Sequence, residues 1–160
     1  MKRWVPHADT GPVSLRPSLV GRSGWSRVLV IDDDPDVGRL VRLILELEGH
    51  EVVLTDDGLR GLAAAQHQRP DAIVLDLMMP VMDGYEVLKQ LQADPRTCDV
   101  PVVVLSAVTL RETRERVEGA GAVAFIAKPF DADQLSRAVA SVIQRPTMSD
   151  SRTGSVSWAR

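Results

Sequence analysis

The fold is decided by residues 27–48, RVLVIDDDPDVGRLVRLILELE, where a short apolar run is followed by acids and then by a helical pattern. Residues 27–31 are mostly β-branched or apolar, which is typical of a strand buried on both faces. Asp34 before Pro35 is a good helix N-cap with proline at the first helical position, and Gly49 lies where that helix should end. The apolar positions of the helix recur at helical spacing on one predicted face: Val37, Leu40, Val41, Ile44 and Leu45.

The same order of strand and helix recurs along the chain. Further β-branched runs occupy residues 51–55, 72–75, 101–105 and 123–127. Helical apolar spacing recurs over residues 58–67, 84–93, 110–119 and 131–144. Five strands alternating with five helices predict an α/β fold with a doubly wound, five-stranded parallel sheet. Right-handed crossovers and short connections favour the flavodoxin-like order 2-1-3-4-5, with a ligand crevice at the carboxyl ends of the strands.

Composition excludes several classes of protein. The 160 residues are 44% hydrophobic and 26% charged, which is enough for one sizeable core. No apolar run approaches the roughly 18 residues of a membrane-spanning helix, so no membrane span and a cytoplasmic location are expected. The single cysteine, Cys98, excludes an internal disulfide and a multi-thiolate metal site. Residues 27–145 carry 20 acidic and 13 basic side chains, so direct nucleic-acid binding is not expected.

The two ends of the chain differ from its middle. Residues 1–25 and 146–160 contain prolines, glycines and serines without a sustained period, so both are predicted to be flexible tails around a domain at residues 26–145. The C-terminal tail is too short for a DNA-binding or catalytic output domain. If the chain is complete, its output is therefore expected to be a contact with another protein.

Chemically distinctive side chains follow four of the predicted strands, and they would meet at one edge of the sheet. They are Asp32, Asp33, Asp76, Ser106 and Lys128, and Ala107 follows Ser106 at the same strand end. Clustered carboxylates repel one another unless a cation lies among them, and Mg²⁺ suits a few carboxylates completed by waters and a phosphate. A hydroxyl and an ammonium group would then bind anionic phosphoryl oxygens. Asp76 is the candidate nucleophile for an acyl phosphate, so the residues predict Mg²⁺-assisted phosphoryl transfer to an aspartate.

The motifs resemble the receiver domain of two-component response regulators over residues 27–145, and the resemblance implies a single-domain regulator. They occur in the order VLVIDDD, VLDLMMPVMDG, VVLSA and IAKPF, and the combination is specific although each alone would be weak. The resemblance implies that Asp76 is the phosphoacceptor. It also implies that Asp32, Asp33, Asp76 and the backbone carbonyl of Met78 form the metal site.

The resemblance further assigns the binding of the phosphoryl group. It gives this role to Ser106, Ala107 and Lys128, and it implies that the bond between Lys128 and Pro129 is commonly cis. An aromatic residue on the fifth strand changes rotamer in this family. The matching position is Phe125, where tyrosine is commoner, so a switch at this position would rest on packing alone.

The function implied by the resemblance is a phosphorylation switch. The chain would accept a phosphoryl group from a histidine kinase or a histidine phosphotransfer protein and act on a downstream protein. The contact face would comprise residues 110–119, 123–127 and 131–144, and it is also a candidate face for a homodimer. The chain would catalyse its own phosphorylation without being a conventional turnover enzyme. Its autodephosphorylation is expected to be slow because Met78 and Val108 cannot orient a water molecule.

Three alternative functions fit the sequence less well. The first is an interaction module that keeps the fold but needs no phosphate, and the complete set of site residues speaks against it. A hydrolase of the haloacid-dehalogenase type would need a second aspartate two residues after the nucleophile, where this chain has Met78. A flavodoxin would need a phosphate loop rich in serine, threonine and glycine after the first strand, where this chain has DDDPD.

Several other residues are expected to be structural. Met78, Met79 and Met82 are predicted to pack and not to bind a soft metal. Asp83–Gly84 has the composition of a turn. The charges of residues 111–118 are predicted to form a solvated face with pairs such as Glu112–Arg116.

Overall fold

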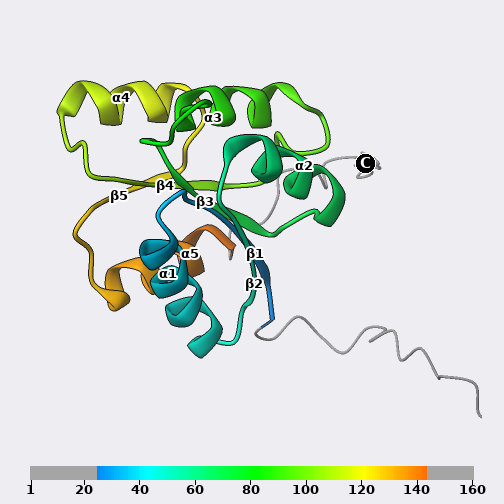
Figure 1. The fold of residues 1–160 in the computed structure, drawn as a ribbon, viewed down its shortest axis with the longest axis vertical. Coiled ribbons are helices and arrows are strands. Elements are labelled where there is room, and N and C mark those ends of the chain that lie inside the picture. Colours follow the sequence, from blue (N-terminus) through cyan, green and yellow to red (C-terminus); the bar gives the residue numbers. More distant parts are fainter. Residues whose placement is uncertain (1–24, 144–160) are drawn as a thin grey trace, which may run out of the picture.

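The computed structural model describes residues 25–143 (Figure 1). The two predicted tails lie outside this range, apart from Trp25, which is exposed. The strands are β1 (Arg27–Ile31), β2 (Glu51–Thr55), β3 (Ala72–Asp76), β4 (Val102–Ser106) and β5 (Ala124–Ala127). The helices are α1 (Pro35–Leu47), α2 (Gly58–Gln68), α3 (Gly84–Ala93), α4 (Arg111–Gly119) and α5 (Ala132–Ile143).

The five strands form one parallel sheet in the order β2-β1-β3-β4-β5, which confirms the predicted topology. The bounds differ slightly from the prediction: Asp76 and Ser106 are the last residues of β3 and β4 and do not follow them. Their backbones are therefore fixed by the sheet, since Asp76 lies opposite Leu105 and Ser106 lies opposite Ala127. The register of the sheet thus fixes the backbone positions from which the Asp76 and Ser106 side chains extend.

Helices cover both faces of the sheet, so the core has two layers. Helices α1 and α5 lie on one face, and α2, α3 and α4 lie on the other (Figure 1). Successive strand residues alternate between the layers: Leu29 and Ile31 pack toward α2 and α3, while Val28 and Val30 pack toward α1 and α5. Burial on both faces explains why the strands are continuously apolar.

Helix α1 begins as predicted but presents a different face to the core. Asp34 caps it by accepting hydrogen bonds from the backbone N–H groups of Asp36 and Val37. Its core stripe is formed by Gly38, Val41, Ile44 and Leu45. The prediction for Leu40 was wrong, because this side chain is 48% exposed. Leu40 lies about 100° around the helix axis from Val41, outside the stripe that faces the sheet.

Within residues 25–143, no helix is long and apolar enough to cross a membrane.

Candidate functional site

Three carboxylates meet at the carboxyl edge of the sheet. Asp32 and Asp33 follow β1, and Asp76 ends the neighbouring strand β3. One carboxylate oxygen of each residue lies within 4.8 Å of those of the other two. Asp32 and Asp76 are buried, with 3% and 4% of their surface exposed, whereas Asp33 is more open to solvent. The predicted acidic cluster is therefore present at the predicted edge.

Lys128 is the first residue after β5, and its side chain extends into this cluster. Its Nζ lies 3.0 Å from Oδ2 of Asp32 and 3.5 Å from Oδ2 of Asp76. The backbone is held in place because the Lys128 N–H donates to the carbonyl of Ser106, and the bond to Pro129 is cis. The structure thus brings together the lysine and two carboxylates that lie 96 and 52 positions away in sequence.

Burial raises the pKa of the Asp32 carboxyl above its ordinary value of 3.8, because desolvation disfavours the charged form. Two hydrogen bonds act in the opposite direction and lower this pKa: one from Lys128 at 3.0 Å and one from the backbone N–H of Asp34 at 2.9 Å. The neighbouring negative charge of Asp76 raises the pKa of Asp32 further. A second cation beside Asp32 would favour its ionised form further. The pocket is therefore electrostatically suited to a positive ion.

Ser106 is completely buried at the end of β4. Its Oγ accepts a hydrogen bond of 3.1 Å from the backbone N–H of Val108, and its own O–H is left to donate to another acceptor. Ala107 follows at the start of the loop toward α4 and is exposed. Both residues lie at the edge where the acidic cluster is found.

The loop after Asp76 folds back against the end of β3. The Met78 N–H donates to Oδ1 of Asp76 at 3.2 Å, which helps to fix the orientation of that carboxylate. Asp83 and Gly84 are not an isolated turn but the N-cap and first residue of α3, since Asp83 accepts from the N–H of Glu86. A Cβ at Gly84 would lie 2.2 Å from the carbonyl oxygen of Asp76, so only glycine allows α3 to begin this close to the strand.

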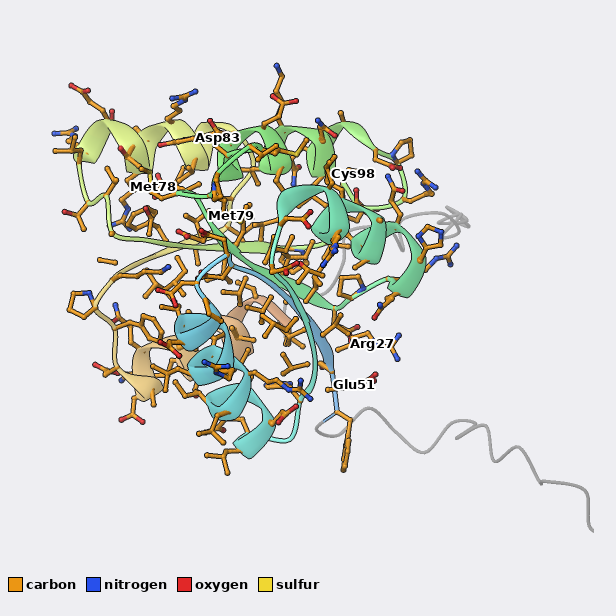
Figure 2. The ribbon with its side chains drawn as sticks, in the orientation of Figure 1. Arg27, Glu51, Met78, Met79, Asp83 and Cys98 are labelled. Carbon is orange, nitrogen blue, oxygen red and sulfur yellow. The ribbon has the colours of Figure 1, made fainter. Side chains whose placement is uncertain are left out.

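The three methionines of this loop differ in environment. Met79 is buried and Met82 packs against the core, as predicted. The prediction was wrong for Met78, whose side chain is 60% exposed. Figure 2 labels Met78 and Met79, which are neighbours in this loop but differ in burial.

The donor set of the acidic cluster fits Mg²⁺. All three side chains offer oxygen ligands, which hard divalent cations prefer over nitrogen or sulfur. Two of the carboxylates are buried, and burying an unpaired charge is costly. Lys128 provides one positive charge for three carboxylates, so a divalent ion would complete the neutralisation.

One contact between α3 and α4 has no counterpart in the sequence pattern. The predicted pair Glu112–Arg116 does not form, because the Arg116 guanidinium instead lies over the ring of Tyr85, 4.0 Å from its centroid. The helix makes two other i,i+4 pairs, Arg111–Glu115 and Arg114–Glu118. No sequence spacing relates Tyr85 to Arg116, so only the packing of α3 beside α4 reveals the contact.

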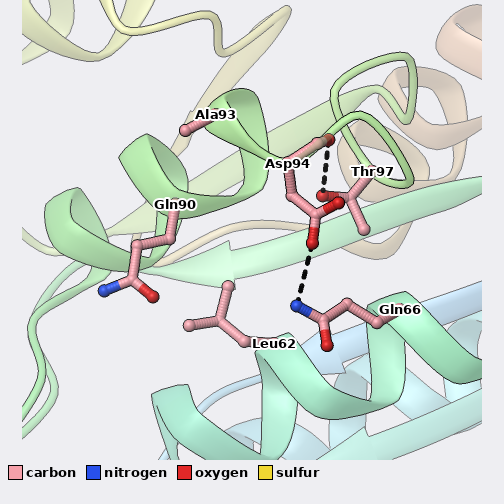
Figure 3. Close-up of a pocket in the computed structure, with 6 residues that line it drawn as sticks. All are labelled: Leu62, Gln66, Gln90, Ala93, Asp94 and Thr97. Atoms are coloured by element: carbon pink, nitrogen blue, oxygen red, sulfur yellow. Dashed lines mark hydrogen bonds between the residues drawn. The ribbon is translucent and has the colours of Figure 1, made fainter.

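A separate groove lies between α2 and α3, away from the carboxyl edge (Figure 3). Its lining residues are Leu62, Gln66, Gln90, Ala93, Asp94 and Thr97. Its polar groups already have partners: Gln66 donates to Asp94, and the Thr97 hydroxyl donates to the carbonyl of Leu91. The hydrogen-bonded Arg96 guanidinium lowers the pKa of the Asp94 carboxyl to about 2. The groove therefore holds a hydrogen-bonded connection between the two helices.

The comparison with protein families agrees with this fold. The family model for the response regulator receiver domain matches residues 28–140. The chain therefore belongs to the receiver domain family of two-component response regulators.

Curated relatives are also similar to this chain. The DNA-binding dual master transcriptional regulator RpaA of Synechocystis is 40% identical over 121 residues, which cover 74% of this chain and 49% of that protein. The transcriptional regulatory protein PrrA of Mycobacterium tuberculosis is 44% identical over 119 residues, covering 74% and 50%. The chain thus spans about half the length of these relatives.

Solved structures show the same fold. The receiver domain of the Francisella response regulator 1452 matches with a TM-score of 0.71 and 31% identity, covering 75% of this chain and 98% of that one. The receiver domain of the sensor histidine kinase PA1611 from Pseudomonas aeruginosa matches with a TM-score of 0.70 and 32% identity, covering 77% and 100%. That second structure is described as having a magnesium ion coordinated in its active site cleft.

Proposed function

We propose that this receiver domain is a phosphorylation switch in which Asp76 accepts a phosphoryl group with the help of Mg²⁺. The observation that carries the proposal is the meeting of Asp32, Asp33 and Asp76 with Lys128 at one edge of the sheet. The donor would be the phosphohistidine of a histidine kinase or a phosphotransfer protein. Membership of the receiver family supports this choice of donor.

The metal would be held by Asp33, Asp76 and the backbone carbonyl of Met78, with Asp32 acting largely through water. When bound, the ion neutralises carboxylate and phosphoryl charge and orients the phosphoryl oxygens. The magnesium described for the PA1611 receiver supports this choice of ion. The all-oxygen donor set of the acidic cluster supports it as well.

In the transfer step, a carboxylate oxygen of Asp76 forms a bond to phosphorus while the bond from phosphorus to the donor imidazole nitrogen breaks. The bonding electron pair returns to the imidazole, and the product is an acyl phosphate. The Lys128 ammonium, the Ser106 hydroxyl and the Ala107 backbone N–H would bind the phosphoryl oxygens. Because Lys128 already lies 3.5 Å from Asp76, it would need only a small movement to do so.

The output would be a contact with a downstream protein through the face formed by α4, β5 and α5. The loop from Ser106 to α4 links the phosphoryl site to that face, so rearranging the Ser106 hydroxyl would reposition the helix. Phe125 on β5 is half-buried against the core beneath this face. A homodimer through the same face is a further part of the proposal.

Phosphorylation by a small donor tests the function without knowledge of the kinase. The full chain is incubated with acetyl phosphate and Mg²⁺, and intact mass is followed. One phosphate is expected to be added, and none after Asp76→Asn or with excess chelator. Asp33→Asn is expected to reduce the rate at least ten-fold, which is about 1.4 kcal/mol in the barrier. The matched control is Asp34→Asn, which removes an adjacent charge but keeps a good helix cap.

The proposal fails if wild-type protein, shown to be folded, takes up no phosphate. It also fails if Asp76→Asn is phosphorylated like the wild type. Uptake by Asp33→Asn at the rate of Asp34→Asn would remove Asp33 from the metal site. If the chain takes up no phosphate and Asp76→Asn binds a downstream protein as well as wild type does, the result would support the interaction module that needs no phosphate.

A further inference from the structure

Helix α4 is weakly anchored in the domain. Val117 is its only buried residue, and its N-cap, Leu110, makes no side-chain hydrogen bond to the helix. Its two ion pairs, Arg111–Glu115 and Arg114–Glu118, connect residues within the helix and leave its position unconstrained. The placement of α4 against its neighbours therefore depends on few contacts.

One of those contacts joins α4 to α3. The Arg116 guanidinium lies 4.0 Å from the ring centroid of Tyr85, well within the range of a cation–π interaction. Tyr85 is half-buried, while Arg116 is otherwise exposed. Within residues 25–143, no hydrogen bond or ion pair links an α4 side chain to another element, so this contact is the one polar side-chain connection of the helix.

Tyr85 belongs to the part of the domain that is rigidly connected to the phosphoacceptor. It follows Gly84, whose backbone lies directly against the carbonyl of Asp76. Helix α3 is then anchored by the buried side chains Val87, Leu88 and Leu91. The backbone of Tyr85 is therefore held close to Asp76, whereas Arg116 would move with α4.

Helix α4 is instead linked to the hydroxyl of Ser106 through the loop that precedes the helix. The Val108 N–H donates to that hydroxyl at 3.1 Å, and the chain then leads through Leu110 into the helix. A phosphoryl group on Asp76 would offer Ser106 a stronger, charged acceptor. A rearrangement of Ser106 would shift the loop and α4 while α3 stays with Asp76, so the distance between Tyr85 and Arg116 would change.

We propose that the Tyr85–Arg116 contact holds α4 in its unphosphorylated position and thereby opposes the phosphorylated state. This inference rests on the function proposed above and adds a regulatory contact to it. A contact made in only one of two conformations shifts their equilibrium by its own free energy. Linkage then requires that removing the contact tighten the binding of any ligand that selects the other conformation.

The probe is beryllium fluoride with Mg²⁺, a stable mimic of a phosphoryl group on a carboxylate, titrated against the full chain and followed by NMR. Exposed cation–π contacts predict a two- to five-fold effect. Tyr85→Leu and Arg116→Met are each expected to lower the half-saturating concentration by that factor. Tyr85→Phe keeps the aromatic face and should match wild type. Arg114→Met makes the same charge change on the same helix and should also match wild type.

The double variant Tyr85→Leu, Arg116→Met separates the contact from other effects of the two substitutions. Because both single changes remove the same interaction, the double variant should bind the probe no more tightly than either one. Affinities of Tyr85→Leu and Arg116→Met equal to wild type, or weaker, would overturn the proposal. So would fully additive effects in the double variant.

Hydrogen exchange of the α4 amides, measured without metal or mimic, tests the contact apart from the proposed function. Exchange should be two- to five-fold faster in Tyr85→Leu than in Tyr85→Phe, because opening of the helix loses one restraint. Equal exchange in the two variants would overturn the inference even if wild type binds the mimic. Failure of wild type to bind the mimic, with faster exchange in Tyr85→Leu, would instead overturn the proposed function and the regulatory role resting on it.

Discussion

Val81 occupies a strained turn in the loop that follows the phosphoacceptor. Its φ is 69°, and the Met82 N–H donates to the carbonyl of Pro80 at 2.8 Å, which defines a γ-turn centred on Val81. A β-branched residue is strongly disfavoured in this region of backbone space. Its side chain is fully exposed and gains no packing in return.

Val81→Gly is therefore expected to raise the free energy of unfolding by about 1 kcal/mol, measured by urea denaturation. The matched control is Val81→Ala, which removes the same methyl groups but retains a Cβ. Alanine should gain less stability than glycine because the strain arises from the Cβ itself. A glycine variant no more stable than the alanine variant would show that the turn is not strained.

We expect the lifetime of the proposed acyl phosphate on Asp76 to depend on two further residues. Met78 is largely exposed and Val108 is half-buried, and neither side chain can orient a water for in-line attack. Phospho-Asp76 is expected to decay over minutes or longer once a small donor is removed in excess Mg²⁺. The double substitution Met78→Asn, Val108→Glu should accelerate this decay about ten-fold or more. Wild-type decay within seconds, or an unchanged rate in the double variant, would contradict this explanation.

The residues of the site could be named from the sequence, but their mutual contacts could not. Asp32, Asp76, Ser106 and Lys128 are found at the predicted edge because parallel strands place their carboxyl ends together. That Lys128 lies closer to Asp32 than to Asp76 depends on side-chain rotamers across the sheet, which no sequence pattern encodes.

At the scale of elements, periodicity predicted every helix and strand and, through the alternation of the two, the order of the sheet. It failed in assigning the faces of single helices. Leu40 follows the apolar spacing of α1 yet is exposed, because the stripe that meets the sheet is narrower than the apolar part of the helix. The face of α4 that packs on the domain could not be predicted either, because its sequence is dominated by charged residues.

Two leucines of α1 test this assignment of faces. Leu45 is completely buried, so Leu45→Ala should lower the free energy of unfolding by about 2–5 kcal/mol. Leu40→Ala, the same chemical change on the same helix, should cost less than about 1 kcal/mol. Urea denaturation compares the two directly. Equal losses of stability would mean that Leu40 belongs to the core after all.

At the scale of the whole molecule, one sheet both forms the centre of the core and brings the ionisable residues of the candidate site together. The continuous apolar strands bury both faces and make a rigid platform, while their carboxyl ends gather the ionisable residues that the core would otherwise exclude. The helices differ in anchoring, from α1 with four buried positions to α4 with one. We therefore expect a change at the rigid edge to displace α4 more readily than α1.

The central claim is that Asp76 becomes phosphorylated, and chemical mapping of the modified residue tests it most directly. The full chain is treated with acetyl phosphate and Mg²⁺, reduced with borohydride to convert the acyl phosphate to an alcohol, and digested for mass spectrometry. Reduction is expected at Asp76 alone and in no sample prepared without Mg²⁺. Reduction at Asp32 or Asp33, or an unmodified Asp76 in folded protein, would contradict the account.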